Sequence, residues 1–258
     1  MCKTKNMKRY ELTKEQWERV KPLLPPEKTG QRGRPRKDNR IMLNGMLRIT
    51  RSGAQWRELP EAYGPWQSVY ARFAKWRDDG TLKKVFRALS EDADTENLSM
   101  DSTCIKVHES ANGGEKRANK AVGRTRGRLN TKLHAIVDSL GNPVEFLLSA
   151  GNEHDCVHTV KLLETVEISG SNILADRAYG AQAIREYILE RGATYVIPPQ
   201  SNISKPWSVD WYLYKERHLI ECFFQKIKWF RRIATRYHKL DASFLAFVYL
   251  ASIAILVI

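Results

Sequence analysis

Three acidic residues far apart in the sequence, Asp101, Asp176 and Glu221, are the strongest candidates for chemistry in this chain. They are separated by 75 and 45 residues. Clustered carboxylates repel one another unless cations neutralise them, and Mg²⁺ or Mn²⁺ are the usual ions at oxygen-rich sites. Two such ions about 4 Å apart can activate a water or a 3′-hydroxyl and stabilise the leaving oxygen of a phosphodiester. If the fold brings the three together, they predict two-metal phosphodiester cleavage.

The segment around Glu221 carries a row of polar side chains at helical spacing. At about 100° per residue, Tyr214, Arg217, Glu221 and Lys228 fall within roughly 60° of one helix face. An adjacent apolar stripe would dock the helix on a sheet, so that Arg217 and Lys228 could hold DNA phosphates near the metals. A surface helix with i,i+4 ion pairs is a common alternative that spacing alone leaves open.

The elements that must position these residues follow from hydrophobic periodicity. Residues 98–108 alternate as a strand with Asp101 on one face. Further strands are predicted at 132–138, 143–150, 171–176 and 193–199, with helices at 155–168, 181–191, 214–240 and 242–258. This order predicts an α+β fold in which helices flank a mixed sheet. Asp176 would end a central strand, where ligands gather at the carboxyl edge of a parallel sheet.

The N-terminal 90 residues read instead as a small helical domain. Thr13 and Gln16 form a capping box, Asp38 can cap a second helix that Gly53 ends, and Pro65 suits the first turn of a third. Short turns between helices favour a helix-turn-helix-like domain. The third helix would then present Gln67, Ser68, Arg72 and Lys75 to DNA. A helical bundle with merely solvated charges remains the alternative.

Charge supports a polyanionic partner. The chain has a formal net charge of +14, and residues 1–90 hold 22 basic and 9 acidic residues, a net of +13. Nucleic acid is the first candidate and an acidic membrane surface the second. Two basic segments are expected to contact DNA: an arm with Arg34, Arg36 and Lys37, and a glycine-rich loop with the arginines Arg124, Arg126 and Arg128.

The same composition indicates how the chain is divided. Residues 91–100 carry four acids and no base. They therefore mark a boundary: residues 1–90 would be a basic DNA-binding domain, 91–96 an acidic linker and 97–258 the catalytic domain. The four cysteines are scattered without a C-x-x-C pair, which disfavours a zinc site and a disulfide framework and fits a reducing cytosol. The apolar run 243–258 has 16 residues, fewer than a membrane span needs, and predicts a buried helix.

Several of these motifs resemble those of one family. The pattern Y-x-x-R-x-x-x-E-x-x-x-x-x-x-K at Tyr214, Arg217, Glu221 and Lys228 is similar to the signature around the final Glu of DDE transposases from bacterial insertion sequences. "MDSTCIKVH" and "ILADRAYGA" resemble the blocks around the first and second Asp. "WRELPEAYGPWQSVYARFAKW" and "FRRIATRYHKL" look like blocks of the insertion-sequence five family, within the insertion-sequence four-like superfamily. The resemblance covers about residues 10–250.

The resemblance implies an RNase H-like catalytic domain that uses two Mg²⁺ (or Mn²⁺) ions to cleave and join DNA at terminal inverted repeats. Asp101 would bridge both metals, and Asp176 and Glu221 would complete one site each. The implied partners are double-stranded DNA, as element ends and target, and further copies of the chain, in a bacterial cytoplasm near the nucleoid. His218 and Cys222 depart from the family's usual Asn and Arg. A decayed or domesticated DNA-binding repressor is therefore the alternative function, and a structure-specific nuclease a weaker third.

Overall fold

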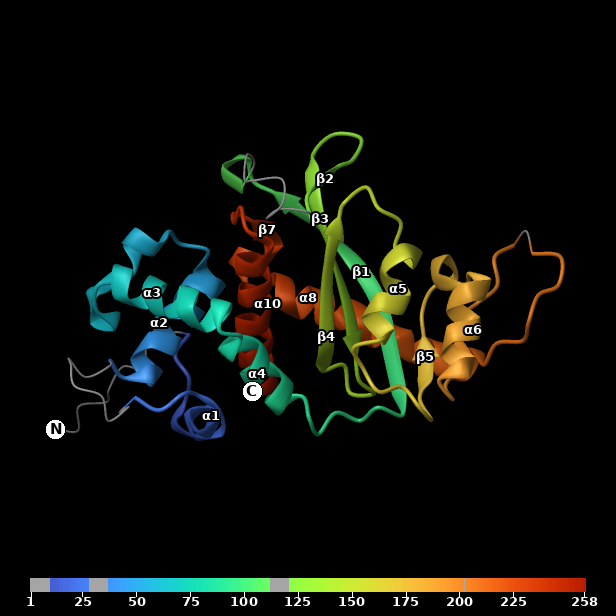
Figure 1. Ribbon diagram of the computed structural model, residues 1–258, viewed down its shortest axis with the longest axis horizontal. Coiled ribbons are helices and arrows are strands. Elements are labelled where there is room, and N and C mark those ends of the chain that lie inside the picture. The colour runs from blue at the N-terminus through green and yellow to red at the C-terminus, as the bar shows by residue number, and fades with distance from the viewer. Residues whose placement is uncertain (1–9, 28–36, 112–120, 202) are drawn as a thin grey trace. The chain divides into compact units, whose positions relative to one another are not determined.

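The computed structural model describes residues 10–27, 37–111, 121–201 and 203–258, which form two compact units (Figure 1). The first unit consists of Met1–Leu89, Trp229–Ile233 and Ala242–Ile258, and the second of Ser90–Lys228 and Ala234–Asp241. After Lys228 the chain thus enters the first unit, returns to the second at Ala234 and enters the first again at Ala242.

The second unit is built on a seven-stranded mixed sheet. Its long central strand β1 (Asn97–Val107) pairs antiparallel with β3 (Leu129–Val137), which pairs antiparallel with β4 (Pro143–Ala150). On the other side, β5 (Asn172–Leu174) runs parallel to β1, and β6 (Thr194–Val196) runs parallel to β5. Two short strands complete the sheet: β2 (Gly123–Arg124) on β3 and β7 (Thr235–Arg236) on β1. The predicted α+β fold with a mixed sheet is confirmed.

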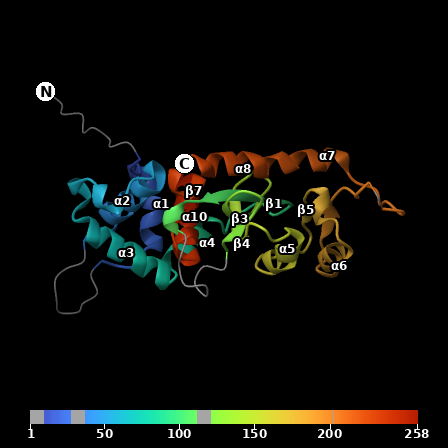
Figure 2. The same cartoon turned by 90° about the horizontal axis from the view of Figure 1, so that it is seen from above.

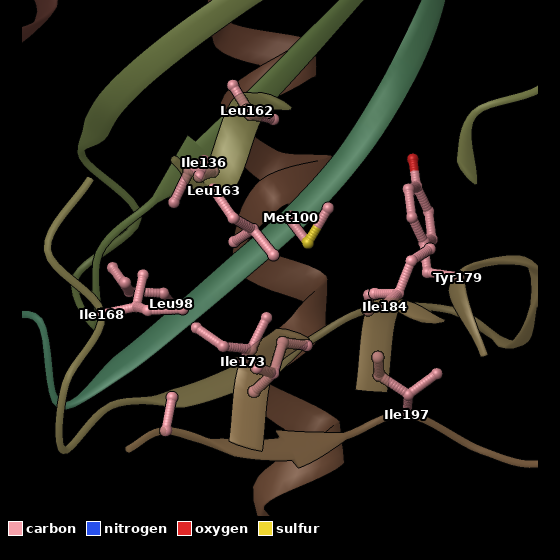
Figure 3. Packing of buried hydrophobic residues seen from close by; sticks show 13 residues of the cluster. Leu98, Met100, Ile136, Leu162, Leu163, Ile168, Ile173, Tyr179, Ile184 and Ile197 are labelled. Atoms are coloured by element: carbon pink, nitrogen blue, oxygen red, sulfur yellow. The ribbon is translucent and has the colours of Figure 1, made fainter. Parts of the chain in front are cut away.

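Helices cover both faces of this sheet. Helices α5 (Cys156–Leu163) and α6 (Gln182–Glu190) lie on one face, and α8 (His218–Lys228) crosses the other (Figure 2). On the α5 and α6 face, Leu98, Met100 and Ile173 pack in a cluster of buried hydrophobic residues with side chains from both helices (Figure 3). On the opposite face, the ring of Phe146 in β4 stacks on that of Phe223 in α8, with centroids 5.8 Å apart. Burial on both faces fixes the register of β1, because a shift by one residue would exchange its two faces.

The predicted long helix over 214–240 is wrong in its extent. The chain forms α7 (Trp211–Tyr214), a 3-10 turn η6 (Lys215–Arg217), α8, and then α9 (Arg231–Ala234) and β7. Helix α8 ends at Lys228, where the chain leaves the second unit for the first. Phe230 and Ile233 are buried there, and a new turn begins with a hydrogen bond from the Ile233 N–H to the Phe230 carbonyl. Burial of these two side chains overrides the local helical periodicity.

The first unit is helical, as predicted. It contains α1 (Lys14–Val20), a 3-10 turn η1 (Lys21–Leu23), α2 (Asn39–Ser52), the 3-10 turns η2 (Trp56–Glu58) and η3 (Glu61–Tyr63), α3 (Trp66–Asp78) and α4 (Thr81–Leu89). The capping box of Thr13 and Gln16 is present, Asp38 caps α2, and Gly53 ends it with a positive φ of 76°. Helix α3 buries Val69, Phe73 and Trp76.

The last helix, α10 (Asp241–Leu256), belongs almost wholly to the first unit. Its Phe247 is fully buried, with its ring centroid 4.6 Å from that of Phe73 in α3 and 6.0 Å from that of Trp56. The predicted buried terminal helix is confirmed, but the structure divides the chain differently from the expected boundary, which assigned 97–258 to one domain. Of the helices in the part of the chain that the structure describes, none is long and apolar enough to cross a membrane.

Candidate active site

Arg217 joins the first and third candidate carboxylates. Its Nη1 lies 3.2 Å from Oδ2 of Asp101 on β1, and its Nη2 lies 2.5 Å from Oε1 of Glu221 on α8. The i,i+4 spacing of Arg217 and Glu221 matches one turn across η6 and α8. Asp101 and Glu221 are 120 residues apart in sequence, so this meeting is a property of the tertiary fold. Arg217 also pairs with Asp101 from the sheet, so its contact with Glu221 is not only an i,i+4 ion pair along one helix.

Alternation along β1 explains which side chains reach α8. Asp101 and Thr103 point to the α8 face, where Lys228 donates a hydrogen bond of 2.6 Å to the Thr103 hydroxyl. The neighbouring Met100 packs in the cluster on the other face. Because side chains alternate along a strand, Arg217 and Lys228 attach α8 to β1 at two points. The predicted polar row is therefore aimed at the sheet.

A pair of asparagines and one glutamate anchor the same elements further along the sheet. Asn97, the first residue of β1, accepts a hydrogen bond of 2.9 Å from the side chain of Asn172 in β5 and donates one of 2.9 Å to Glu216 in η6. Two strands and the turn that carries Arg217 are thus tied together by side chains. This connection holds Arg217 in register with Asp101.

The second candidate, Asp176, follows β5 and caps the 3-10 turn η5 (Arg177–Tyr179), where its Oδ1 accepts the Ala178 N–H at 2.7 Å. Burial raises the pKa of Asp101 to about 6, and the negative charge of Asp176 acts in the same direction, whereas the Ser102 N–H and Arg217 oppose it. A negative charge near a carboxyl group disfavours its ionisation, which is the direction in which Asp176 acts on Asp101. In the parallel pairing of β1 with β5, Ser99 lies opposite Leu174, so Asp101 and Asp176 each lie two residues beyond that pair, while Glu221 lies on the other side of Arg217 from Asp101.

These three residues have the chemistry of a site for Mg²⁺ or Mn²⁺. All donors are carboxylate oxygens, and the raised pKa of Asp101 shows that its local positive charge does not fully offset burial and the neighbouring acid. Among the residues that the structure describes, no group of three His, Cys, Asp or Glu side chains is close enough together to hold a metal ion. Arg217 lies between Asp101 and Glu221 instead. The donor set fits a divalent ion in kind, and Arg217 occupies the space between two of the donors.

Comparison with known proteins identifies the family. Residues 12–86 match the family described as "Putative transposase of IS4/5 family", and residues 92–256 match the family described as "Transposase DDE domain". The second match covers more than half of the chain. The chain belongs to the DDE transposase family.

One relative named as a putative transposase agrees with this assignment, and a second relative is similar in sequence. The transposase is 42% identical over 124 residues to "Putative transposase for insertion sequence element IS6501" from Brucella ovis, which covers 48% of this chain and 95% of the relative. It is 38% identical over 105 residues to "Uncharacterized protein y4sN" from Sinorhizobium fredii, which covers 41% of this chain and 83% of the relative. The expected insertion-sequence resemblance is confirmed.

A solved structure shares the fold. The transposase matches a chain of the piggyBac transposase synaptic complex with hairpin DNA at a TM-score of 0.56 and 10% identity, covering 96% of this chain and 72% of that one. This likeness concerns the fold alone. Together with the DDE domain match it confirms the predicted RNase H-like architecture.

A second polar group beside Asp101 was not expected from the sequence. Ser102 donates a hydrogen bond of 2.8 Å to Asp155, and Lys132 on β3 pairs with the same carboxylate oxygen at 2.9 Å. Burial alone would raise the pKa of Asp155, but the hydrogen bonds from Lys132 and Ser102 outweigh it and hold the pKa below its ordinary value. The only available sequence signal was an acid at the first position of the helix predicted over 155–168, which also fits an ordinary cap.

His134 on β3 links this polar group to the stability of the transposase. It is 2% exposed, and its Nε2 lies 2.8 Å from the Ser149 hydroxyl. Burial lowers its pKa to about 4, an effect that Asp155 opposes and His158 and Lys132 reinforce. His134 is therefore protonated near pH 6.5 in the unfolded chain but only near pH 4 in the folded chain. Since the unfolded state binds more protons in this window, stability falls as the pH falls.

We expect the free energy of unfolding to fall by about 3 kcal/mol between pH 6.5 and pH 4 because of the lowered pKa of His134. The measurement is urea unfolding at several pH values for the parent and for His134→Gln, whose amide can still bond Ser149. The difference in unfolding free energy between the parent and His134→Gln should change between pH 6.5 and pH 4 and stay constant above and below this range. A constant difference at all pH values would show that His134 titrates normally in the fold.

The predicted DNA contacts in the second unit lie on its surface. Arg124 is in β2, which corrects the expectation that the whole segment is a loop, because Gly123 and Arg124 pair with β3. Arg126 and Arg128 lie in the turn between β2 and β3, and all three arginines are exposed. Their exposure leaves their role in DNA contact a prediction.

In the first unit, the side chains predicted to face DNA differ in how far they are exposed and free to bind a phosphate. Arg34 and Arg36 lie outside the described residues. Lys75 is exposed, whereas Lys37 donates a hydrogen bond of 3.4 Å to Ser68. Arg72 is half-buried and hydrogen-bonded to Asn39. Arg72 therefore braces α3 against the start of α2, and Lys75 is the better placed of the α3 cations to meet a phosphate.

Proposed function

We propose that this chain is a DNA transposase that binds the terminal inverted repeats of an insertion sequence and catalyses metal-dependent hydrolysis and strand transfer at their ends. The observation that carries the proposal is the bridge of Arg217 between Asp101 and Glu221, with Asp176 acting on Asp101 from the end of β5. The membership of the chain in the DDE transposase family supports the same conclusion. The piggyBac neighbour, named as a synaptic complex with hairpin DNA, is consistent with a homodimer or higher oligomer on DNA.

Asp101, Asp176 and Glu221 would hold two divalent ions, which supply Lewis-acid stabilisation of the reacting phosphate and a lowered pKa for the attacking hydroxyl or water. The chain's own contribution is to place these oxygens on a rigid sheet and helix. Arg217 and Lys228 lie on either side of Glu221 along the helical segment and carry the charges that would position the scissile strand. Tyr214, whose ring lies 5.9 Å from the Arg217 guanidinium carbon, would extend this contact surface.

The departures from the family pattern do not touch these contacts. His218 is exposed and its Nδ1 lies 2.8 Å from the Lys215 carbonyl, while Cys222 is exposed with a free thiol. The direct test is a cut-and-join assay, in which the purified chain and Mg²⁺ are given DNA carrying the repeats that flank the gene. Cleaved and joined products support the transposase, and repeat binding without any product would favour the repressor.

Binding of DNA should depend on the exposed arginines of the β2–β3 turn. We expect Arg126→Gln combined with Arg128→Gln to weaken duplex binding and to reduce the slope of log affinity against log salt by about 1.8, because each phosphate contact contributes about 0.9. The measurement is fluorescence anisotropy of a labelled duplex carrying the element end, at several salt concentrations.

The matched control removes two exposed cations elsewhere on the same unit, Lys161 on α5 and Arg191 after α6. This control variant should reduce the long-range attraction between the protein and DNA as much as the turn variant does. It should leave unchanged the part of the slope of log affinity against log salt that comes from phosphate contacts. Equal effects of the two double variants would mean that the turn makes no specific phosphate contact.

A further inference from the structure

The surface next to Asp176 is hollowed into a pocket of about 550 Å³ that the roles assigned above do not use. We name it the Arg185 pocket; the residues that matter to its chemistry are Cys156, Gln182, Arg185, Gln200, Lys205 and Trp207. Ala178 also lines it and donates its backbone N–H to the carboxylate of Asp176 at 2.7 Å. A ligand in this pocket would therefore lie beside the second candidate carboxylate.

The charge of the pocket is positive. Arg185 and Lys205 line it, and among the described residues no carboxylate lines it and neither cation forms an ion pair. A guanidinium and an ammonium without acidic partners in a hollow attract an anion, and phosphate is the anion that this class of protein meets on its substrate.

Arg185 is held in place by the fold. Its guanidinium carbon lies 3.7 Å from the ring centroid of Trp207, and its Nε donates a hydrogen bond of 3.3 Å to the Gly180 carbonyl. Trp207 is fixed in turn by a hydrogen bond of 2.7 Å from its indole N–H to the Ile197 carbonyl. These contacts leave the two terminal nitrogens of the guanidinium for a ligand. A positioned arginine loses little freedom when it binds.

The remaining polar groups suit a nucleobase. The side-chain nitrogen of Gln200 donates to the Arg177 carbonyl at 3.4 Å, and that of Gln182 donates to Glu186 at 2.7 Å. Both amide oxygens can then accept from base amino groups. The volume lies within the range of small-ligand pockets. A base can offer its Watson–Crick edge and its flat face to such a pocket only when it is unpaired, since pairing covers that edge and stacking covers that face in a duplex.

We propose that the Arg185 pocket binds one unpaired nucleotide of the DNA strand that runs past Asp176, with its phosphate on Arg185 and Lys205. The proposal rests on the proposed transposase function. It adds to that function a site that distinguishes a frayed or single-stranded end from a closed duplex.

The test is equilibrium binding by the full chain in metal-free buffer, where no cleavage occurs. Two probes are compared: a blunt duplex carrying the element end, and the same duplex with a three-nucleotide single-stranded extension. The unmodified chain should bind the extended probe about tenfold more tightly, as expected for one or two charge-assisted contacts. Arg185→Gln combined with Lys205→Gln should remove most of this preference while binding to the blunt duplex stays within about threefold.

The control variant, Lys161→Gln with Arg191→Gln, removes the same charge outside the pocket and should keep the preference. An unmodified chain that binds both probes equally, or a preference that survives in the pocket variant, overturns the pocket proposal and leaves the transposase standing. A chain that binds neither probe overturns both.

A second measurement does not depend on the stability of the variants. Cys156 lines the pocket and is half-buried, and Cys104 is an exposed reference thiol on β1. Alkylation by N-ethylmaleimide, followed by mass spectrometry, should slow at Cys156 relative to Cys104 with the extended probe and not with the blunt one. Equal protection by both probes would contradict occupation by an unpaired nucleotide.

Discussion

Glu221→Gln is expected to abolish Mg²⁺-dependent cleavage of element-end DNA, with a loss of about 10³-fold or more. The amide keeps the shape of the side chain and can still accept a hydrogen bond from Arg217. It removes a negative charge that would hold a metal, and metal ions supply several kcal/mol of transition-state stabilisation. Single-turnover cleavage of labelled repeat DNA measures the effect.

Binding separates this catalytic loss from a folding defect. The variant should bind the same DNA within about threefold, because the substitution deletes an acid and no cation. Glu190→Gln, which alters an exposed carboxylate at the end of α6, is the matched control and should cleave normally. Cleavage by Glu221→Gln at the rate of the unmodified chain would remove this residue from the proposed triad. A separate outcome, in which the unmodified chain itself does not cleave, would make the repressor the better description.

Phe247→Ala is expected to lower the free energy of unfolding of the first unit by about 3–5 kcal/mol, the usual cost of emptying a fully buried phenylalanine site. The ring packs against Phe73 and Trp56, and the Arg232 guanidinium carbon lies 6.0 Å from its centroid. Such a loss is a large part of the 5–15 kcal/mol that stabilises an ordinary domain. Urea unfolding followed by tryptophan fluorescence measures it, with Trp56 as a reporter close to the substituted site.

The control lies just beyond the same helix. Ile258 is 88% exposed, and Ile258→Ala should change stability by less than about 0.5 kcal/mol. A loss below about 1 kcal/mol for Phe247→Ala would mean that α10 is not part of the core of the first unit. By the same reasoning, residues 1–90 alone lack a buried helix of their own unit and should be far less stable than the full chain.

Local patterns in the sequence were sufficient for most of the individual elements. Strict alternation predicted β1 and the face that carries Asp101, and the capping chemistry of Thr13, Asp38 and Gly53 predicted where two helices begin or end. Asp138 stabilises a turn, because its Oδ1 accepts hydrogen bonds from the Leu140 and Asn142 N–H groups. These features depend on neighbours within about four residues, so the sequence displays them directly.

Features that depend on distant partners were missed or only partly predicted. The polar row from Tyr214 to Lys228 has the right spacing for one helix face, but nothing local shows that the segment breaks into α7, η6 and α8 or that the chain changes unit after Lys228. The contact of Asp155 with Ser102 joins residues 53 apart. No periodicity reports such a pair, because it forms only when α5 is laid across the sheet.

The sequence by itself determined the chemistry available to this protein: three carboxylates, a row of cations around the last of them, and an excess of positive charge for DNA. The tertiary structure decided which of these groups meet. It placed Arg217 between Asp101 and Glu221, turned Arg72 inward to Asn39, and put α10 with the N-terminal helices. The physical reason is that residue type and spacing specify what a side chain can do, whereas its partner is selected by the burial of apolar faces far away in the chain.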